Sequence, residues 1–169
     1  MLSEVLRDSD FALYDIDGER LQQSAGILES MARSLGLEPK IRCYCGPENR
    51  KEALRGANFI INAINVGGYD PCTITDFEVP KKFGLRQTIG DTIGIGGIMR
   101  TLRTIPVMEE FARDIEEVCP DAWFLNYTNP MAMLSGYMQR YTGVKTVGLC
   151  HSVQVCAKSL LETLGMDMS

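Results

Sequence analysis

The chain has 169 residues, enough for one domain with a substantial buried core. Its 45% hydrophobic and 23% charged residues are ordinary for a soluble globular protein, and a formal charge of −5 argues against nucleic acid or anionic lipid as the main partner. No apolar run approaches the roughly 18 residues of a membrane span, and residues 1–4 lack the basic start of a signal peptide.

Cysteines are spread along the chain without the paired spacing of a zinc ribbon or a small disulfide scaffold. The six occupy positions 43, 45, 72, 119, 150 and 156. Reduced thiols in a cytoplasmic protein are the simplest interpretation of this distribution. We therefore expect a cytoplasmic protein that binds neither membranes nor nucleic acid.

The first third of the chain alternates apolar runs with helical periodicities. Residues 11–16 form an apolar run typical of a buried strand, and apolar residues then recur at helical spacing from Leu21 to Leu35, where Gly36 predicts a helix end. Residues 41–45 predict a second strand, a brief helix runs from Pro47 to about residue 56, and residues 57–64 predict a third strand.

The same alternation continues to the end of the chain. The pattern predicts a helix over 98–118, a strand over 122–125, a helix over 131–141, a strand over 144–149 and a helix over 153–164. One face of the helix over 98–118 carries the expected core residues, which are Ile105, Met108, Phe111, Ala112 and Ile115.

Strands that are apolar throughout and alternate with helices indicate an α/β fold, a Rossmann-like parallel sheet with helices on both faces. Such a dinucleotide-binding fold normally opens with a strand, a Gly-rich turn and a helix. That turn is missing here, and Gly94, Gly96 and Gly97 lie too late, so we assign them to a loop. We expect residues 1–169 to form one partial NAD-binding domain, incomplete at both ends, with a free sheet edge where the first strand would pair.

The most informative segment is Cys150-His151, which follows the apolar run 144–149. His151 is the single histidine of the chain. In open α/β sheets ligands bind at the carboxyl ends of the strands, where a thiolate is able to hold a metal and an imidazole to exchange a proton. The alternative is a buried cysteine beside a hydrogen-bonded core histidine.

Five segments, in order along nearly the whole chain, resemble glycoside hydrolase family 4. They are residues 15–17 (Asp-Ile-Asp), 62–68 (Asn-Ala-Ile-Asn-Val-Gly-Gly), 90–97 (Gly-Asp-Thr-Ile-Gly-Ile-Gly-Gly), 126–132 (Asn-Tyr-Thr-Asn-Pro-Met-Ala) and 148–154 (Gly-Leu-Cys-His-Ser-Val-Gln). The Cys-His-Ser step is similar to the α-galactosidase branch, although α-galacturonidases can also show it.

The resemblance implies an unusual glycosidase that uses NAD and Mn²⁺, an exception to the two-carboxylate mechanism. In this family NAD⁺ oxidises the sugar C3 hydroxyl, a base removes the acidified C2 proton, and the aglycone is eliminated. Water then adds and NADH reduces C3 again. The metal polarises the oxygens at C2 and C3.

The resemblance also implies residue roles. His151 is the expected catalytic acid and Cys150 the expected metal ligand; Asn129 and Asp91 are expected to bind substrate, and Asp15 and Asn65 to bind the cofactor, Asp15 through the adenosine ribose. The base and a further metal-binding histidine would lie beyond Ser169. We expect the full-length protein to cleave α-galactosides, with α-galacturonides as the alternative, and to form a homo-oligomer, whereas residues 1–169 alone should be inactive.

Two other classes stay open at this point. Malate and lactate dehydrogenases share the sheet order, an acid closing the second strand and a later Asn-Pro, but they have no need for a cysteine at position 150. A non-enzymatic NAD-sensing or structural domain is the third interpretation. Cys43 and Cys45 lie on one face of a strand, and we expect them to belong to the core.

Overall fold

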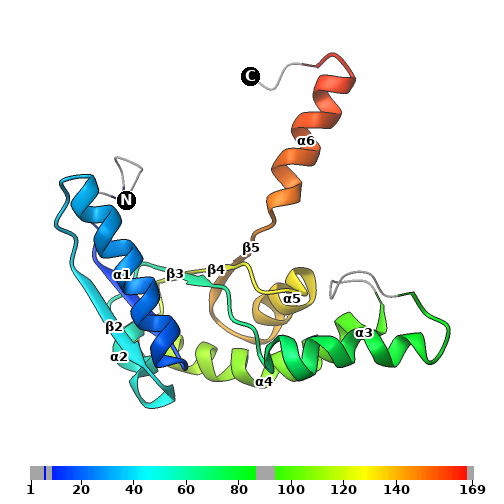
Figure 1. Cartoon of the computed structure of the whole chain (residues 1–169), viewed down its shortest axis with the longest axis horizontal. Coiled ribbons are helices and arrows are strands. Elements are labelled where there is room, and N and C mark those ends of the chain that lie inside the picture. Colours follow the sequence, from blue (N-terminus) through cyan, green and yellow to red (C-terminus); the bar gives the residue numbers. More distant parts are fainter. Residues whose placement is uncertain (1–5, 7–8, 87–93, 167–169) are drawn as a thin grey trace. The chain divides into compact units, whose positions relative to one another are not determined.

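The computed structural model describes residues 6, 9–86 and 94–166 (Figure 1). The chain divides into two compact units. One comprises residues 1–57 and 114–120, and the other comprises residues 58–113 and 121–169. Within the described part of the chain, no helix has the length and apolar character needed to cross a bilayer.

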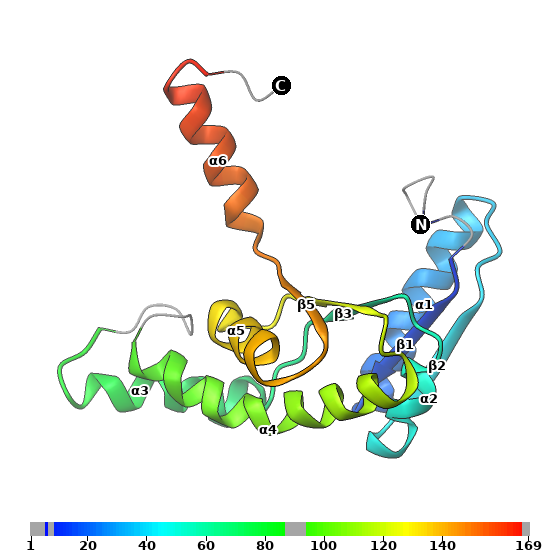
Figure 2. The same cartoon turned by 180° about the vertical axis from the view of Figure 1, so that it is seen from behind.

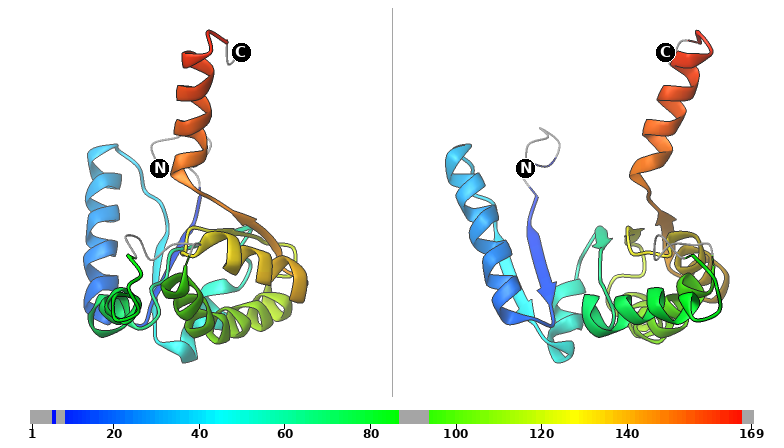
Figure 3. Two further views of the ribbon diagram at one scale, coloured as in Figure 1. Left: turned by 90° about the vertical axis from the view of Figure 1, so that its right-hand side faces the viewer. Right: turned by 45° about the vertical axis from the view of Figure 1, so that its right-hand side comes forward.

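The first unit is built on two parallel strands, β1 (Phe11–Asp15) and β2 (Ile41–Cys45), in register from one end to the other. Helix α1 (Gly18–Ser34) connects them and lies along both strands (Figure 3). It begins where the Asp17 carboxylate accepts hydrogen bonds from the first backbone amides of the helix, and its apolar face is buried. The carboxyl end of β1 at Asp15 is thus followed, two residues later, by the N-cap of α1 at Asp17.

A short helical segment completes this unit: η2 (Pro47–Asn49) continues into α2 (Arg50–Leu54). Arg50 Nε donates to Asp114 Oδ2 at 2.5 Å, and both side chains are about nine-tenths buried. Since a buried charge is costly without a partner, this pair ties α2 to residues 114–120 of the same unit.

The second unit contains three parallel strands in the order β3 (Phe59–Asn62), β4 (Trp123–Asn126) and β5 (Lys145–Gly148). Its helices are η3 (Gly68–Thr73), α3 (Ile74–Lys81), α4 (Ile95–Val118), α5 (Met131–Tyr141) and α6 (His151–Thr163). Helix α5 packs against β5 (Figure 2). Among the described helices and strands of this unit, none lies along α6 in either view of Figure 3.

The core of this unit gathers on one face of the three strands. Phe124 of β4 is fully buried, together with Met108 of α4 and Leu134 and Met138 of α5. Alternate strand residues point the other way, and Phe59 of β3 is 67% exposed. The three strands are therefore held in place by the packing of α4 and α5 on one face of the sheet. Among the described residues, the opposite face of the sheet is exposed at Phe59.

Most of the predicted elements are confirmed, although β1, β5 and β3 are one, two and four residues shorter than their apolar runs and β4 begins and ends one residue later than predicted. The expected parallel pairing holds in both sheets, and the helix over 131–141 and the strand over 41–45 have the predicted bounds. The face of α4 expected in the core is buried at Met108, Phe111 and Ile115. The described residues form two separate sheets, β1–β2 in the first unit and β3–β4–β5 in the second.

Three expectations are wrong or incomplete. Gly96 and Gly97 lie in the first turn of α4 and not in a loop, because they are buried there and packing outweighs the low helix propensity of glycine. Cys43 and Cys45 are exposed and do not belong to the core, because the described elements around β2 leave both side chains open to solvent. Helix α3 was not predicted, because Pro80 lies within it and its apolar residues do not follow a 3.6-residue period.

Two glycines of the second unit give a test of the packing between α5 and β5. A Cβ at Gly148 would lie 2.3 Å from Met131 Sδ and 2.7 Å from Ser135 Oγ, whereas one at Gly136 meets nothing within 4 Å. We expect Gly148→Ala to lower the free energy of unfolding by about 1–3 kcal/mol through overpacking. Gly136→Ala should raise it by about 0.5–1 kcal/mol, because alanine loses less backbone entropy within α5.

Urea unfolding followed by tryptophan fluorescence measures both changes, because Trp123 of β4 is the single tryptophan of the chain. Changes of the same sign in the two variants would contradict this account of the α5–β5 contact.

Candidate functional site at the carboxyl ends of β3, β4 and β5

The three strands of the second unit end side by side. Asn62 of β3 lies opposite Asn126 of β4, and Asn126 lies opposite Gly148 of β5. The segments that follow each strand therefore start from one edge of the sheet. These segments carry four of the expected site residues, which are Asn65 after β3, Asn129 after β4, and Cys150 and His151 after β5.

A buried hydrogen-bond network joins the ends of β3 and β4. Asn62 Nδ2 donates to Asn126 Oδ1 at 2.9 Å and to Thr128 Oγ1 at 3.0 Å. Asn126 Oδ1 also accepts from the Thr128 amide at 3.1 Å, and Asn126 Nδ2 donates to Ser135 Oγ of α5 at 3.1 Å. All four residues are at least 95% buried. Satisfied polar groups of this kind fix a backbone geometry, because leaving one unpaired is costly.

Asn129 follows directly on this network. Its neighbours Thr128 and Pro130 are buried, while Asn129 itself is exposed. The local fold thus holds the backbone on both sides of Asn129 and leaves its amide side chain accessible to a ligand.

Cys150 and His151 lie where β5 passes into α6. The Leu149 amide donates to the Asn126 carbonyl at 2.9 Å, which ties this segment to β4. Cys150 is the N-cap residue of α6, but its side chain makes no capping hydrogen bond. Both Cys150 and His151 are exposed, so the alternative of a buried cysteine and a core histidine is wrong. The thiol is thus not used in capping the helix that follows it.

The His151 ring has an aromatic neighbour. Its centroid lies 5.3 Å from that of Tyr127, with a tilt of 39° between the rings. Tyr127 directly follows β4, and its amide donates to the Asn62 carbonyl at 2.8 Å. The imidazole at the end of β5 is therefore in contact with the segment that leads from β4 to Asn129.

Two arginines of α4 hold the segment that follows β3. Arg100 Nη2 donates to Asn65 Oδ1 at 3.3 Å, and Arg103 Nε donates to the Val66 carbonyl at 3.1 Å. Arg103 also pairs in two-point fashion with Asp76 of α3, whose side chain is 1% exposed. This carboxylate raises the pKa of Arg103 further above its usual range. Sequence analysis did not identify Arg100 or Arg103, since neither arginine lies in a recognisable motif.

Gly67 shows how closely that segment packs. Its φ is +87°, and a Cβ there would lie 2.5 Å from Cys72 Sγ. Only glycine combines this left-handed backbone with such a close approach. Asn65 is thus held from both sides, by Arg100 and by the turn that follows it.

Asp15 belongs to the first unit, at the carboxyl end of β1. Arg20 of α1 donates to both of its carboxylate oxygens at 2.7 Å, and the Asp17 amide donates to Oδ1 at 3.0 Å. The hydrogen bonds from Arg20 are the main cause that holds the pKa of the Asp15 carboxyl below its usual value, and the hydrogen bond from the Asp17 amide adds to it. Its side chain keeps 24% exposure, so an ionised acceptor faces solvent.

The remaining expected site residue, Asp91, lies outside the described residues, as do the other residues of 90–93 in the 90–97 motif. Among the residues that the structure does describe, there is no group of three or more His, Cys, Asp or Glu able to hold a metal ion. Among the described residues, the expected metal ligand Cys150 is therefore not part of a complete metal-binding site.

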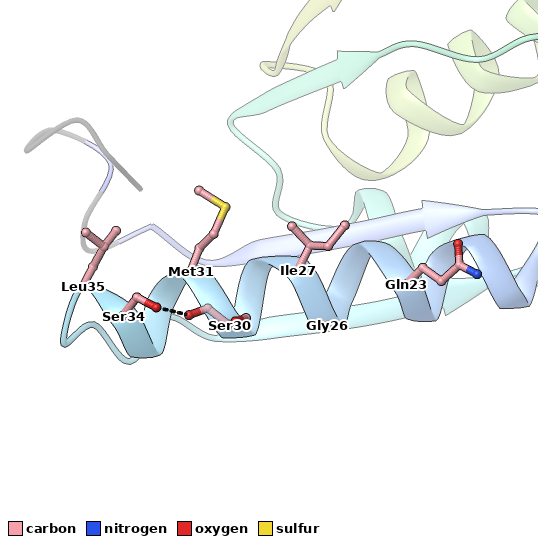
Figure 4. A pocket seen from close by; sticks show the side chains of 7 residues that line it. All are labelled: Gln23, Gly26, Ile27, Ser30, Met31, Ser34 and Leu35. Carbon is pink, nitrogen blue, oxygen red and sulfur yellow. Dashed lines mark hydrogen bonds between the residues drawn. The ribbon is translucent and has the colours of Figure 1, made fainter.

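A shallow hollow also lies along α1 (Figure 4). It is lined by Gln23, Gly26, Ile27, Ser30, Met31, Ser34 and Leu35. None of these side chains is titratable, and none is an expected site residue. Acid–base or metal chemistry is therefore better supported at the strand ends.

Comparison with known proteins gives matches along nearly the whole chain. Residues 1–166 match the description "Family 4 glycosyl hydrolase". An α-galactosidase of Bacillus subtilis (strain 168) is 59% identical over 99% of this chain and 38% of its own length. An α-galacturonidase of Thermoanaerobacter italicus is 38% identical over 93% of this chain and 34% of its own.

Solved structures support the fold. A 6-phospho-α-glucosidase from gut microorganisms, in complex with NAD and Mn²⁺, has a TM-score of 0.75 at 23% identity, covering 92% of this chain and 34% of that one. The chain spans less than two fifths of the length of each of these relatives. The Rossmann-like fold predicted from the sequence is confirmed.

Replacement of Asn126 tests the network that joins the strand ends. Asn126→Ala removes one of the acceptors of Asn62 Nδ2, the acceptor of the Thr128 amide and the donor to Ser135 Oγ. Since buried groups left unpaired cost about 1–3 kcal/mol each, partly relieved by relaxation, we expect a loss of about 2–4 kcal/mol in the free energy of unfolding.

Asn58→Ala is the matched control, because Asn58 is exposed and immediately precedes β3. Its unfolding free energy in urea should stay within about 0.5 kcal/mol of wild type. Equal effects of the two substitutions would mean that the network does not hold the strand ends together.

Proposed function

Because the chain belongs to family 4 of the glycosyl hydrolases, we propose that the protein in its full length hydrolyses α-galactosides with NAD and Mn²⁺. The choice of sugar is supported by the 59% identity to an α-galactosidase and by the step Cys150-His151-Ser152. The structural observation that carries the proposal is the convergence of Asn65, Asn129, Cys150 and His151 on one sheet edge.

The residues at the strand ends suit a dinucleotide. Asp15 offers an ionised, partly exposed carboxylate at the carboxyl end of β1, the type of group that binds an adenosine ribose. When bound, NAD⁺ supplies the hydride acceptor for the sugar C3 hydroxyl. The exposed amides of Asn65 and Asn129 would offer hydrogen-bond donors and acceptors to the cofactor and to the sugar hydroxyls, and their backbones are held by Arg103 and by the Asn126 network.

His151 is proposed as the acid that protonates the leaving oxygen. Its ring is exposed, as a proton donor to substrate must be, and contact with Tyr127 limits its orientation. Cys150 is proposed as one metal ligand through its thiolate. The described residues do not complete a metal site, and Mn²⁺ prefers several hard ligands, so Cys150 contributes one bond of a larger set.

An α-galacturonidase is the second candidate, supported by the relative that is 38% identical. Such an enzyme would have to bind the carboxylate that a galacturonide carries in place of the C6 hydroxymethyl group. Family membership favours a glycosidase over the malate or lactate dehydrogenase interpretation and over an NAD-sensing domain. The charge of −5 and six free cysteines support a cytoplasmic protein that binds no nucleic acid or membrane, and we expect the full-length protein to be a homo-oligomer.

Hydrolysis of aryl glycosides by the full-length protein tests the proposal. We expect release of nitrophenol from the aryl α-galactoside only when NAD⁺, Mn²⁺ and a reductant are all present, with slower or no release from the α-galacturonide. The reverse preference would establish the second candidate. Absence of hydrolysis on both substrates, in a protein that stays folded, would contradict a glycosidase.

Cys150 and His151 are tested by separate changes. Cys150→Ser should raise the Mn²⁺ concentration needed for half-maximal activity by about tenfold or more, because a hydroxyl is a much poorer anionic ligand than a thiolate. Cys156→Ser is the matched control, an exposed cysteine on the same helix. It should leave the Mn²⁺ dependence unchanged.

His151→Ala should slow substrates with poor leaving groups by about 10²–10⁴-fold and activated aryl galactosides much less, the behaviour of a lost general acid. Comparison of kcat/KM for alkyl and nitrophenyl galactosides measures this. Equal losses on both would assign His151 a structural role.

A further inference from the structure

The first turns of α4 place an arginine among the segments that carry the candidate site residues. Arg100 Nη2 donates to Asn65 Oδ1 at 3.3 Å, in the segment after β3. Its neighbour Thr101 donates through Oγ1 to Met133 Sδ at 3.1 Å, in the first turn of α5, which begins shortly after Asn129. Arg100 therefore lies close to the segments that follow both β3 and β4.

These two segments are themselves in contact. Thr128 Oγ1 donates to the Ile64 carbonyl at 3.2 Å, which joins the residue before Asn129 to the residue before Asn65. Asn65 and Asn129 are exposed, and Arg100 is partly exposed. One guanidinium and two amides thus lie at neighbouring positions along the strand-end edge.

Arg100 differs in charge balance from Arg103, the next arginine of α4. Arg103 is matched by the buried carboxylate of Asp76. As far as the structure describes the chain, Arg100 forms no ion pair, and its side chain donates to the neutral amide of Asn65 instead. Because a guanidinium stays protonated in proteins, its positive charge is available to a ligand.

The bond to Arg100 also fixes what Asn65 presents. A guanidinium has donors and no acceptor, so the atom of Asn65 that faces it has to be the amide oxygen Oδ1. The other end of the same exposed amide is Nδ2, which has two N–H donors. Arg100 and Asn65 together therefore offer N–H donors and a positive charge, the combination that binds an anionic oxygen.

We propose that Arg100 and Asn65 form a subsite for the carboxylate of an acidic sugar, through which α-galacturonides enter the same site as α-galactosides. The inference rests on the proposed function, since it takes the sugar to bind at the strand ends beside Asn129. A carboxylate matches the planar fork of a guanidinium at two points. Arg100 is thereby assigned a role in substrate specificity.

A phosphate of the dinucleotide is the competing anion, and the fold binds it elsewhere. In dinucleotide-binding folds the pyrophosphate lies at the N-terminus of the helix that follows the first strand. Arg100 and Asn65 instead belong to the second unit, where the Thr128 contact joins their segment to that of Asn129. A group of the sugar is for this reason the better match.

Calorimetric titration of the full-length protein with D-galacturonate and with D-galactose tests the inference without turnover. NAD⁺ is present and Mn²⁺ is left out, because the metal would itself attract a carboxylate. Wild type should bind galacturonate at least as tightly as galactose, and added salt should weaken the binding of galacturonate alone. Arg100→Gln should weaken galacturonate about ten- to a hundredfold and galactose less than about threefold.

Arg113→Gln is the matched control. Arg113 is an exposed arginine of the same helix, about 20 Å further along it at 1.5 Å per residue. Its replacement should leave the affinities for both sugars at their wild-type values.

The outcomes separate the two proposals. Absence of hydrolysis on both aryl glycosides, in a folded protein, would contradict the proposed function itself. If the α-galactoside is hydrolysed but galacturonate binds Arg100→Gln as tightly as wild type, only the inference fails. It also fails if Arg100→Gln weakens both sugars equally, since Arg100 would then merely orient Asn65. Should Arg100→Gln not fold, as judged by circular dichroism, equal salt dependence of the two sugars in wild type would overturn the inference.

Discussion

The hydrogen bonds between Asn62, Asn126 and Thr128 are the constraint on which the candidate site depends. They join the carboxyl ends of β3 and β4 inside the protein, where every amide and hydroxyl group must find a partner. Because Asn126 also reaches Ser135 of α5, the same network sets how the helix after Asn129 meets the sheet. The exposed side chains at the carboxyl ends of the strands thus follow directly on a buried network of hydrogen bonds.

Close packing extends this constraint to β5. The absence of a side chain at Gly148 lets Met131 and Ser135 of α5 approach the strand just before Cys150. On the other side, Arg103 holds the segment after β3 through the Val66 carbonyl and pairs with the buried Asp76. The candidate ligand-binding side chains are exposed, but each is attached to backbone that is fixed by buried contacts. Such support suits a site in which small displacements cost activity.

In the first unit, the expected site residue at the carboxyl end of its strand is supported by an ion pair. At the end of β1, Asp15 is kept ionised and oriented by Arg20, and the adjoining helix is capped by Asp17. Here the supporting charge is itself exposed, and the acid is oriented by an ion pair at the surface and not by a buried network.

The sequence by itself determined the alternation of strands and helices, their parallel pairing, the family, and the positions of Asp15, Asn129, Cys150 and His151 at strand ends. These follow from local periodicity and from motifs that are contiguous along the chain. Only the tertiary structure decided that Asn62 meets Asn126, 64 residues away, that Arg103 holds Val66 and pairs with Asp76 of α3, a helix not evident from periodicity, and that Cys43 and Cys45 are exposed. The physical reason is that partners and burial depend on which segments fold together, and side chains far apart in sequence carry no local sign of the neighbour they will meet.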